Sequence, residues 1–176
     1  MLEGTLPKSI DTKRLDSGET RFEGTVPLAA LRRLRDLVLT PEAKVRAVIE
    51  IRREAGACVT VTGTVETRVR LECQRCLQPK EILLQAPFQL LAVGSAAEAE
   101  VLAGRSDPLV APNGVIDLLI TLEDELLLAL PPVPMHESNE ACGQRNWRFG
   151  PPEAVDAAVR RRNPFAVLEQ LKNKGD

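Results

Sequence analysis

Hydrophobic and polar residues alternate along the middle of the chain, which is the pattern of β-strands with one buried face. Apolar side chains occupy every second position from Lys44 to Arg52, and the alternation resumes from Val59 to Cys73. This period of two predicts antiparallel strands with one face in water. A third strand is expected from Ile82 to Val93, so that Cys73–Cys76 forms the turn before it. Gly63 interrupts the second run, where we expect a bulge or bend.

Two other stretches show the spacing of amphipathic helices. Pro27 precedes LAALRRLRDLV, whose leucines fall on one face, and proline is favourable at a helix start. Asp117 is a plausible N-cap for a largely buried helix that ends before Pro131. The other segments are expected to be a strand at 19–26, a mobile loop at 94–108, a Pro-rich irregular stretch at 131–163 and a short helix from Pro164.

Together these elements predict an α+β fold in one domain over residues 1–176. We expect a mainly antiparallel, twisted or partly closed β-sheet packed with a few short helices, and a loosely attached Pro-rich tail over 131–176. The 176 residues are 44% hydrophobic but only 3% aromatic, so Leu, Val, Ile and Ala must build the core. No apolar run is long enough for a transmembrane helix and no signal peptide is recognised, so we expect a cytoplasmic protein without a membrane partner.

The formal net charge of -2 conceals a strong segregation of charge along the chain. Counting Lys and Arg against Asp and Glu, residues 30–80 carry a net charge of +5 and residues 81–142 a net charge of -9. The flanking segments 1–29 and 143–176 carry -1 and +3. This pattern suggests a surface with two poles of opposite charge, unless the two segments simply neutralise each other in the fold.

A Cys-x-x-Cys motif, Cys73-Gln74-Arg75-Cys76, is the strongest local signal for chemistry. In a turn between strands it resembles a zinc knuckle, and His136 and Cys142 are the candidates for the other two ligands of a structural Zn²⁺. Two plain thiols and a redox pair are the alternatives, although thioredoxin-like motifs begin a helix rather than join antiparallel strands. Cys58 is interpreted as a packing residue.

Catalytic chemistry finds little support in the sequence. The chain has one histidine and no Gly-rich phosphate loop, so we assign no catalytic or cofactor-binding residue and predict that the protein is not an enzyme. The carboxylates of Glu123, Asp124 and Glu125 have three interpretations: a solvated helix face, ion pairs with the basic strands, or mimicry of an anionic ligand.

Nucleic acid is the better candidate partner. Arg75 lies between the two cysteines, and Arg68, Arg70 and Lys80 are close in sequence. In the tail, cations and aromatic residues are interleaved at Arg145, Trp147, Arg148 and Phe149, a combination suited to phosphate contact and base stacking. The aromatic pair could equally anchor the tail to the core.

Three strings resemble the bacterial YceD family in the same order. They are LECQRCLQP, IDLLITLEDELLLALPPVPMH and RNPFAVLEQLK, and the resemblance spans about residues 5–174. The resemblance implies a role in the synthesis, processing or stability of 23S ribosomal RNA, without known enzymatic activity and with candidate metal and nucleic-acid binding. Four residues match the Cys-pair and the following His/Cys positions of the family: Cys73, Cys76, His136 and Cys142.

We therefore expect a non-catalytic factor in large-subunit biogenesis. Arg68, Arg70, Arg75 and Lys80 would contact phosphates of 23S rRNA or its precursor, while Glu123 and Asp124 would face a basic partner such as a ribosomal protein or a ribonuclease. The alternative is a protein-interaction adaptor with an acidic face and no RNA contact. A thiol redox enzyme is a third, weaker interpretation.

Overall fold

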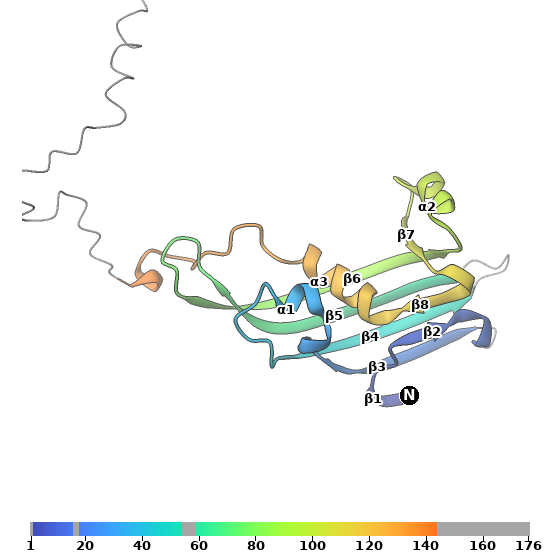
Figure 1. The fold of residues 1–176 in the computed structure, drawn as a ribbon, viewed down its shortest axis with the longest axis horizontal. Helices are drawn as coiled ribbons and strands as arrows, with labels where there is room; N and C mark the ends of the chain where they lie inside the picture. The colour runs from blue at the N-terminus through green and yellow to red at the C-terminus, as the bar shows by residue number, and fades with distance from the viewer. Residues whose placement is uncertain (1, 16–17, 54–58, 144–176) are drawn as a thin grey trace, which may run out of the picture. The chain divides into compact units, whose positions relative to one another are not determined.

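The computed structural model describes residues 2–15, 18–53 and 59–143, which form two sheets and three α-helices (Figure 1). The strands are β1 (Leu2–Thr5), β2 (Ser9–Asp11), β3 (Glu19–Pro27), β4 (Lys44–Arg53), β5 (Val59–Glu72), β6 (Pro79–Val93), β7 (Asp107–Val110) and β8 (Val115–Asp117). The α-helices are α1 (Arg32–Arg35), α2 (Ala96–Leu102) and α3 (Leu118–Leu128). Single 3-10 turns lie at Thr12–Arg14, Leu28–Ala30, Pro112–Gly114 and Glu140–Cys142.

The main sheet has six strands in the order β1-β3-β4-β5-β6-β7. Its four central strands are antiparallel, as the alternation predicts, while β1 and β7 pair in parallel at the two edges. Strands β2 and β8 form a small antiparallel sheet of their own. The predicted α+β class is therefore confirmed, with an open and mainly antiparallel sheet.

The core lies between one face of the main sheet and a layer made of α1, α3 and the β2–β8 pair (Figure 1). The sheet contributes its alternate apolar residues, and the layer contributes leucines and isoleucines that are at most 5% exposed. The layer residues are Ile10, Leu28, Leu31, Leu34, Ile116, Leu118, Leu122 and Leu126. Asp117 caps α3 as predicted, since its Oδ1 accepts the N–H of Ile120 at 3.0 Å.

Two predicted segments differ from the structure. The helix expected after Pro27 is broken at Leu31, whose φ of -91° and ψ of 90° separate a 3-10 turn from the one-turn α1. This break lets Leu28, Leu31 and Leu34 all reach the core. The 94–108 segment is not simply a loop, because Ser95 caps α2: its hydroxyl oxygen accepts the Glu98 N–H at 3.3 Å, and the Glu98 carboxylate accepts the Gly94 N–H at 2.9 Å.

Gly63 does not mark a bulge, since the register runs without interruption from Ile49 through Gly63 to Phe88. The glycine instead leaves room for its neighbours. A Cβ atom at this position would lie 2.5 Å from the carbonyl oxygen of Val48 and 2.7 Å from Cζ of Phe88. The ring of Phe88, 8% exposed, therefore occupies the space that a side chain would fill.

Gly63→Ala is therefore expected to destabilise the protein by about 2 kcal/mol, because the Phe88 ring and the β4 backbone must both shift. Urea unfolding of the variant measures this loss. Gly104→Ala is a control for the added methyl group, since that site has open space around it, although its positive φ adds a smaller strain. A Gly63→Ala midpoint equal to that of the wild type would contradict the packing argument.

Several predictions fall on residues outside those described. They concern the turn at 54–57, Cys58, the interleaved residues Arg145, Trp147, Arg148 and Phe149, and the helix from Pro164. The single-domain prediction for residues 1–176 and the attachment of its tail likewise stay predictions. Among the described helices, none has the length and apolar content needed to cross a bilayer.

Candidate metal centre

The turn between β5 and β6 holds Cys73 and Cys76 in a tight loop. The Cys73 N–H donates to the Gln78 carbonyl at 3.0 Å, and the Leu77 N–H donates to the Cys73 carbonyl at 2.8 Å. Leu77 has a φ of 59°, in the left-handed region that non-glycine residues rarely occupy. Both cysteines are buried although they lie at the end of a hairpin. This strained, closed turn places two thiols on one side of the backbone.

The segment after α3 folds against this hairpin tip. The Gln74 N–H donates to the Pro134 carbonyl at 2.8 Å, and Lys80 Nζ donates to the Met135 carbonyl. Figure 1 shows this segment running beside the end of the β5–β6 hairpin. The chain therefore brings residues some 60 positions downstream to the Cys-x-x-Cys turn.

Arg75 is the main clamp between the turn and this loop. Its guanidinium donates to the carbonyls of His136 and Ser138 at 2.9 and 2.5 Å, and also to the side chain of Asn139. Its Nε lies 3.0 Å from Sγ of Cys142. A guanidinium has five N–H donors, and most of these are used within the loop.

The four predicted ligands converge at this place. Their ligand atoms all lie within 4.8 Å of one another. Nδ1 of His136 is 3.4 Å from Sγ of Cys76 and 3.6 Å from Sγ of Cys142, and the sulfurs of Cys73 and Cys142 are 4.0 Å apart. The structure thus brings together the residues that the sequence could only propose as a set.

The donor set fits a tetrahedral zinc ion. Tetrahedral angles with zinc–sulfur and zinc–nitrogen bonds of about 2.3 and 2.1 Å place two sulfurs about 3.8 Å apart and sulfur and nitrogen about 3.6 Å apart. The distances from 3.4 to 4.0 Å bracket these values. Three cysteines and one histidine form one of the common closed sets of structural zinc sites. Nδ1 is the ring nitrogen that faces the sulfurs, so a zinc ion bound there would require the ring proton to be on Nε2.

The thiols are in an environment that favours metal binding. Burial raises the pKa of the Cys73 thiol, but N–H groups of Cys76, Arg75 and His136 donate to the sulfur and bring its pKa down to about 5. Burial, and the neighbouring sulfurs of Cys73 and Cys142, raise the pKa of Cys76. Crowded thiols resist becoming thiolates together, and a divalent cation removes this conflict by pairing with all of them.

The four basic residues proposed for RNA contact lie along the same hairpin but in different settings. Arg75 and Lys80 are bonded to the 131–143 loop, as described above. Arg68 is 3.8 Å from Glu81 in an exposed ion pair. Arg70 is exposed, and its side chain has no partner among the described residues.

Ion pairs cover much of the sheet face that points away from the core. Arginines of β3 and β4 pair with glutamates of neighbouring strands, as in Arg21 with Glu50 at 2.5 Å and Arg46 with Glu23 at 2.7 Å. The basic residues of this face are therefore largely balanced by carboxylates. The clustering predicted from the alternation is present, but it does not produce a uniformly basic surface.

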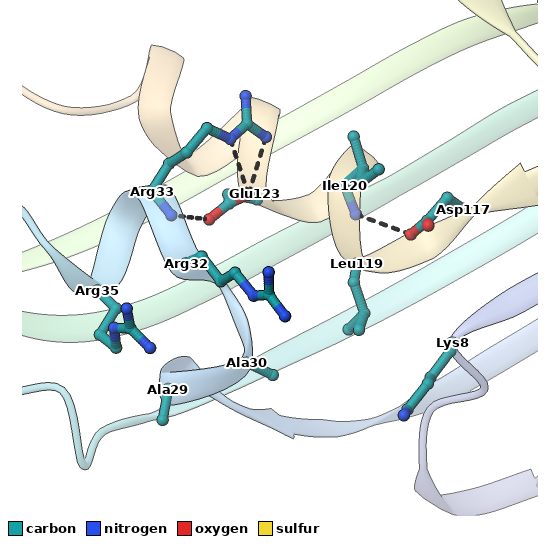
Figure 2. Close-up of a pocket in the computed structure, with 10 residues that line it drawn as sticks. All are labelled: Lys8, Ala29, Ala30, Arg32, Arg33, Arg35, Asp117, Leu119, Ile120 and Glu123. Atoms are coloured by element: carbon teal, nitrogen blue, oxygen red, sulfur yellow. Dashed lines mark hydrogen bonds and ion pairs between the residues drawn. The ribbon is translucent and has the colours of Figure 1, made fainter.

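The two carboxylates proposed for partner binding differ sharply in exposure. The carboxylate of Glu123 is buried, at 6% residue exposure, and accepts the backbone N–H groups of Arg33 at 2.6 Å and Leu34 at 3.2 Å. It also receives the Arg33 guanidinium at 2.9 Å (Figure 2). Asp124 is half-exposed and pairs with the same guanidinium at 2.7 Å. Glu123 thus anchors α1, whereas Asp124 remains accessible.

The sequence interpretation missed two features of this region. Nothing in a lone Cys-x-x-Cys motif indicates that its internal arginine will clamp a distant loop. The Arg-Arg-Leu-Arg run of α1 is visible in the sequence, but its spacing indicates only an amphipathic helix and not a pocket. The structure places these arginines beside α3 and Lys8, away from the hairpin (Figure 2).

Comparison with known proteins places this geometry in context. A family model described as "Large ribosomal RNA subunit accumulation protein YceD" matches residues 61–172, which include all four residues of the candidate metal centre. A protein of that name from Haemophilus influenzae is 34% identical over 173 residues, covering 96% of this chain and 97% of that protein. No solved structure matches the chain.

Proposed function

Because the chain belongs to the YceD family, we propose that it is a non-catalytic factor in the synthesis, processing or stability of 23S ribosomal RNA. The observation that carries the proposal is that the side chains of Cys73, Cys76, His136 and Cys142 converge in space. The family match also spans all four residues. Four protein ligands close a zinc coordination sphere and leave no position for a substrate. Such a centre supports a binding surface rather than a reaction.

In this proposal zinc has a structural task. Cys73 and Cys76 hold it from the hairpin tip, while His136 and Cys142 hold it from the loop that follows α3. The ion supplies a cross-link between segments about 60 residues apart. This cross-link fixes the Arg75 clamp and the hairpin in one arrangement, which a binding surface needs.

RNA contact is proposed along the basic side of the hairpin. Arg70 has no partner among the described residues, and the Arg68 ion pair is so exposed that a phosphate could replace Glu81 at little cost. Arg75 and Lys80 keep donors near the same tip while they hold the loop. Phosphate contacts of this kind are independent of sequence and sensitive to salt.

A second candidate function, that of a protein-interaction adaptor, is supported by negative charge gathered around the second half of α3 and the start of β7. Asp107, Asp124 and Glu125 line a pocket of about 470 Å³ beside β6. The pKa of Glu125 is raised mainly by burial, and further by repulsion from the charges of Asp107 and Asp124. A basic protein, such as a ribosomal protein or a ribonuclease, would relieve this repulsion. The chain would then act as an adaptor without touching RNA.

Binding of a pre-23S rRNA fragment across a salt series tests the first proposal. We expect measurable affinity at low salt that falls steeply as salt rises, because phosphate contacts release counterions. Asp107→Lys with Glu125→Lys should leave or strengthen RNA affinity, and should abolish function only if the adaptor alternative is correct. An affinity that is unmeasurable at low salt, or unchanged by salt, would contradict direct RNA binding.

A further inference from the structure

A basic pocket lies away from the hairpin, between α1, the loop before β2 and the first turn of α3 (Figure 2). Its volume is about 740 Å³. Four cationic side chains line it, together with small and apolar residues and two carboxylates. The cations are Lys8, Arg32, Arg33 and Arg35, the other residues are Ala29, Ala30, Leu119 and Ile120, and the carboxylates are Asp117 and Glu123.

The two carboxylates of the pocket are already used by the fold. Asp117 caps α3 through the Ile120 N–H, and Glu123 is buried under Arg33. Among the described residues, neither carboxylate forms an ion pair with Lys8 or Arg32. The side chains of Lys8 and Arg32 have no hydrogen-bond or ion-pair partner within the described ranges, and Arg35 pairs only with its exposed neighbour Asp36 at 3.0 Å.

The arrangement of the cations suits an anionic chain. Figure 2 shows Lys8 and Arg32 extending into the space between them from opposite sides, with Leu119 and Ala30 nearby. Arg33 is held by Glu123 and by Asp124, so one wall of the pocket is fixed before any ligand arrives. Ile120 is 53% exposed at the rim and offers an apolar surface beside the charges.

We propose that this pocket binds the sugar–phosphate backbone of single-stranded RNA, with Lys8 and Arg32 contacting phosphates and Leu119 and Ile120 contacting the ribose or base. Arginine and lysine that lack internal partners bind phosphates without losing an existing contact. The apolar rim distinguishes the site from one for a free inorganic anion. The inference rests on the proposed RNA-related function and gives it a second contact surface besides the hairpin.

The test is fluorescence anisotropy of a labelled single-stranded RNA oligonucleotide, titrated with the full chain over a salt series. Lys8→Gln with Arg32→Gln should weaken binding at least about tenfold at low salt and reduce the slope of log K against log salt by about 1.4, the value for two lost single-strand contacts. Because neither side chain has a partner among the described residues, the variant should keep its melting temperature.

Two control variants remove the same charge elsewhere. The first control combines Arg14→Gln with Arg105→Gln, two positions outside the pocket. It should change the RNA affinity less than about twofold, as expected for a small change of overall charge. Arg68→Gln with Arg70→Gln probes the hairpin separately. If the Lys8 and Arg32 variant behaves like the first control while the wild type binds RNA, the pocket inference is wrong and the proposed function stands.

Two further outcomes overturn the inference in different ways. If the wild type shows no RNA affinity at low salt, direct RNA contact fails at the pocket and at the hairpin together. A labelled oligoglutamate peptide serves as the second probe. If that peptide binds the wild type more tightly than the RNA does, and Lys8→Gln with Arg32→Gln abolishes its binding, the pocket belongs to an acidic protein partner.

Discussion

Replacing Cys76 by serine is expected to reduce bound zinc from about one equivalent per chain to near zero. A serine oxygen is a poor zinc ligand, and the remaining three donors cannot close the coordination sphere. Structural zinc contributes roughly 10–16 kcal/mol of apparent binding free energy in zinc-finger peptides, so the loss should be among the largest that a single substitution can cause here. Elemental analysis of protein purified without a His-tag measures the metal content.

The structural consequence should be local. Strands β3, β4 and β5 share a buried core that does not include the metal centre, so they should keep slow amide exchange. Amides at the hairpin tip and along residues 131–143 should exchange faster in Cys76→Ser. The contacts left between the two segments would include the Arg75 clamp, the bond from Lys80 to the Met135 carbonyl and the bond from the Gln74 N–H to the Pro134 carbonyl. Removal of zinc by a chelator should reproduce this pattern in the wild type.

Glu137→Gln is the matched control for this experiment. Glu137 belongs to the same loop, is exposed and provides no ligand atom to the cluster, so its replacement should leave the zinc content unchanged. A wild-type protein that is fully folded and free of metal would overturn the zinc assignment. The close sulfurs would then be free thiols, or a redox pair if their disulfide forms reversibly.

The residues of the candidate metal centre could be proposed from the sequence because they are few and chemically distinctive. A chain with one histidine and four cysteines offers a short list of candidates, and loop-closure entropy permits a separation of about 60 residues. The central strands could be predicted equally well, because a half-buried strand requires apolar residues at every second position of the sequence. The capping aspartate of α3 likewise leaves a local signal.

What the sequence could not show depends on contacts between distant residues. The parallel edge strands β1 and β7 are four residues long, too short for a periodic pattern, and their positions are set by neighbours. From its own strand alone, Gly63 predicts a bulge, because the Phe88 ring that fills its space lies on another strand. The sequence leaves three interpretations open for the acidic run 123–125, because it does not show that Glu123 is buried while Asp124 is half-exposed.

Glu123→Ala is expected to destabilise the protein by about 3 kcal/mol. The buried carboxylate accepts the Arg33 and Leu34 N–H groups and pairs with the Arg33 guanidinium, so its removal leaves buried donors without an acceptor. Among the described residues, the single turn α1 is otherwise held by Leu28, Leu31 and Leu34 in the core and by the half-exposed Arg33–Asp124 ion pair. Amide exchange at residues 33 and 34 should therefore rise with the loss of stability. Urea unfolding and native-state exchange measure the two effects.

Neighbouring substitutions separate burial from charge in this prediction. Glu123→Gln keeps the acceptor oxygen and the shape, so it should lose less stability than alanine, roughly 1–2 kcal/mol. Asp124→Asn removes an equally close ion pair that is half-exposed, and should cost less than about 1 kcal/mol. Equal losses for Asp124→Asn and Glu123→Ala would mean that charge alone, rather than the buried acceptor, holds α1 against α3.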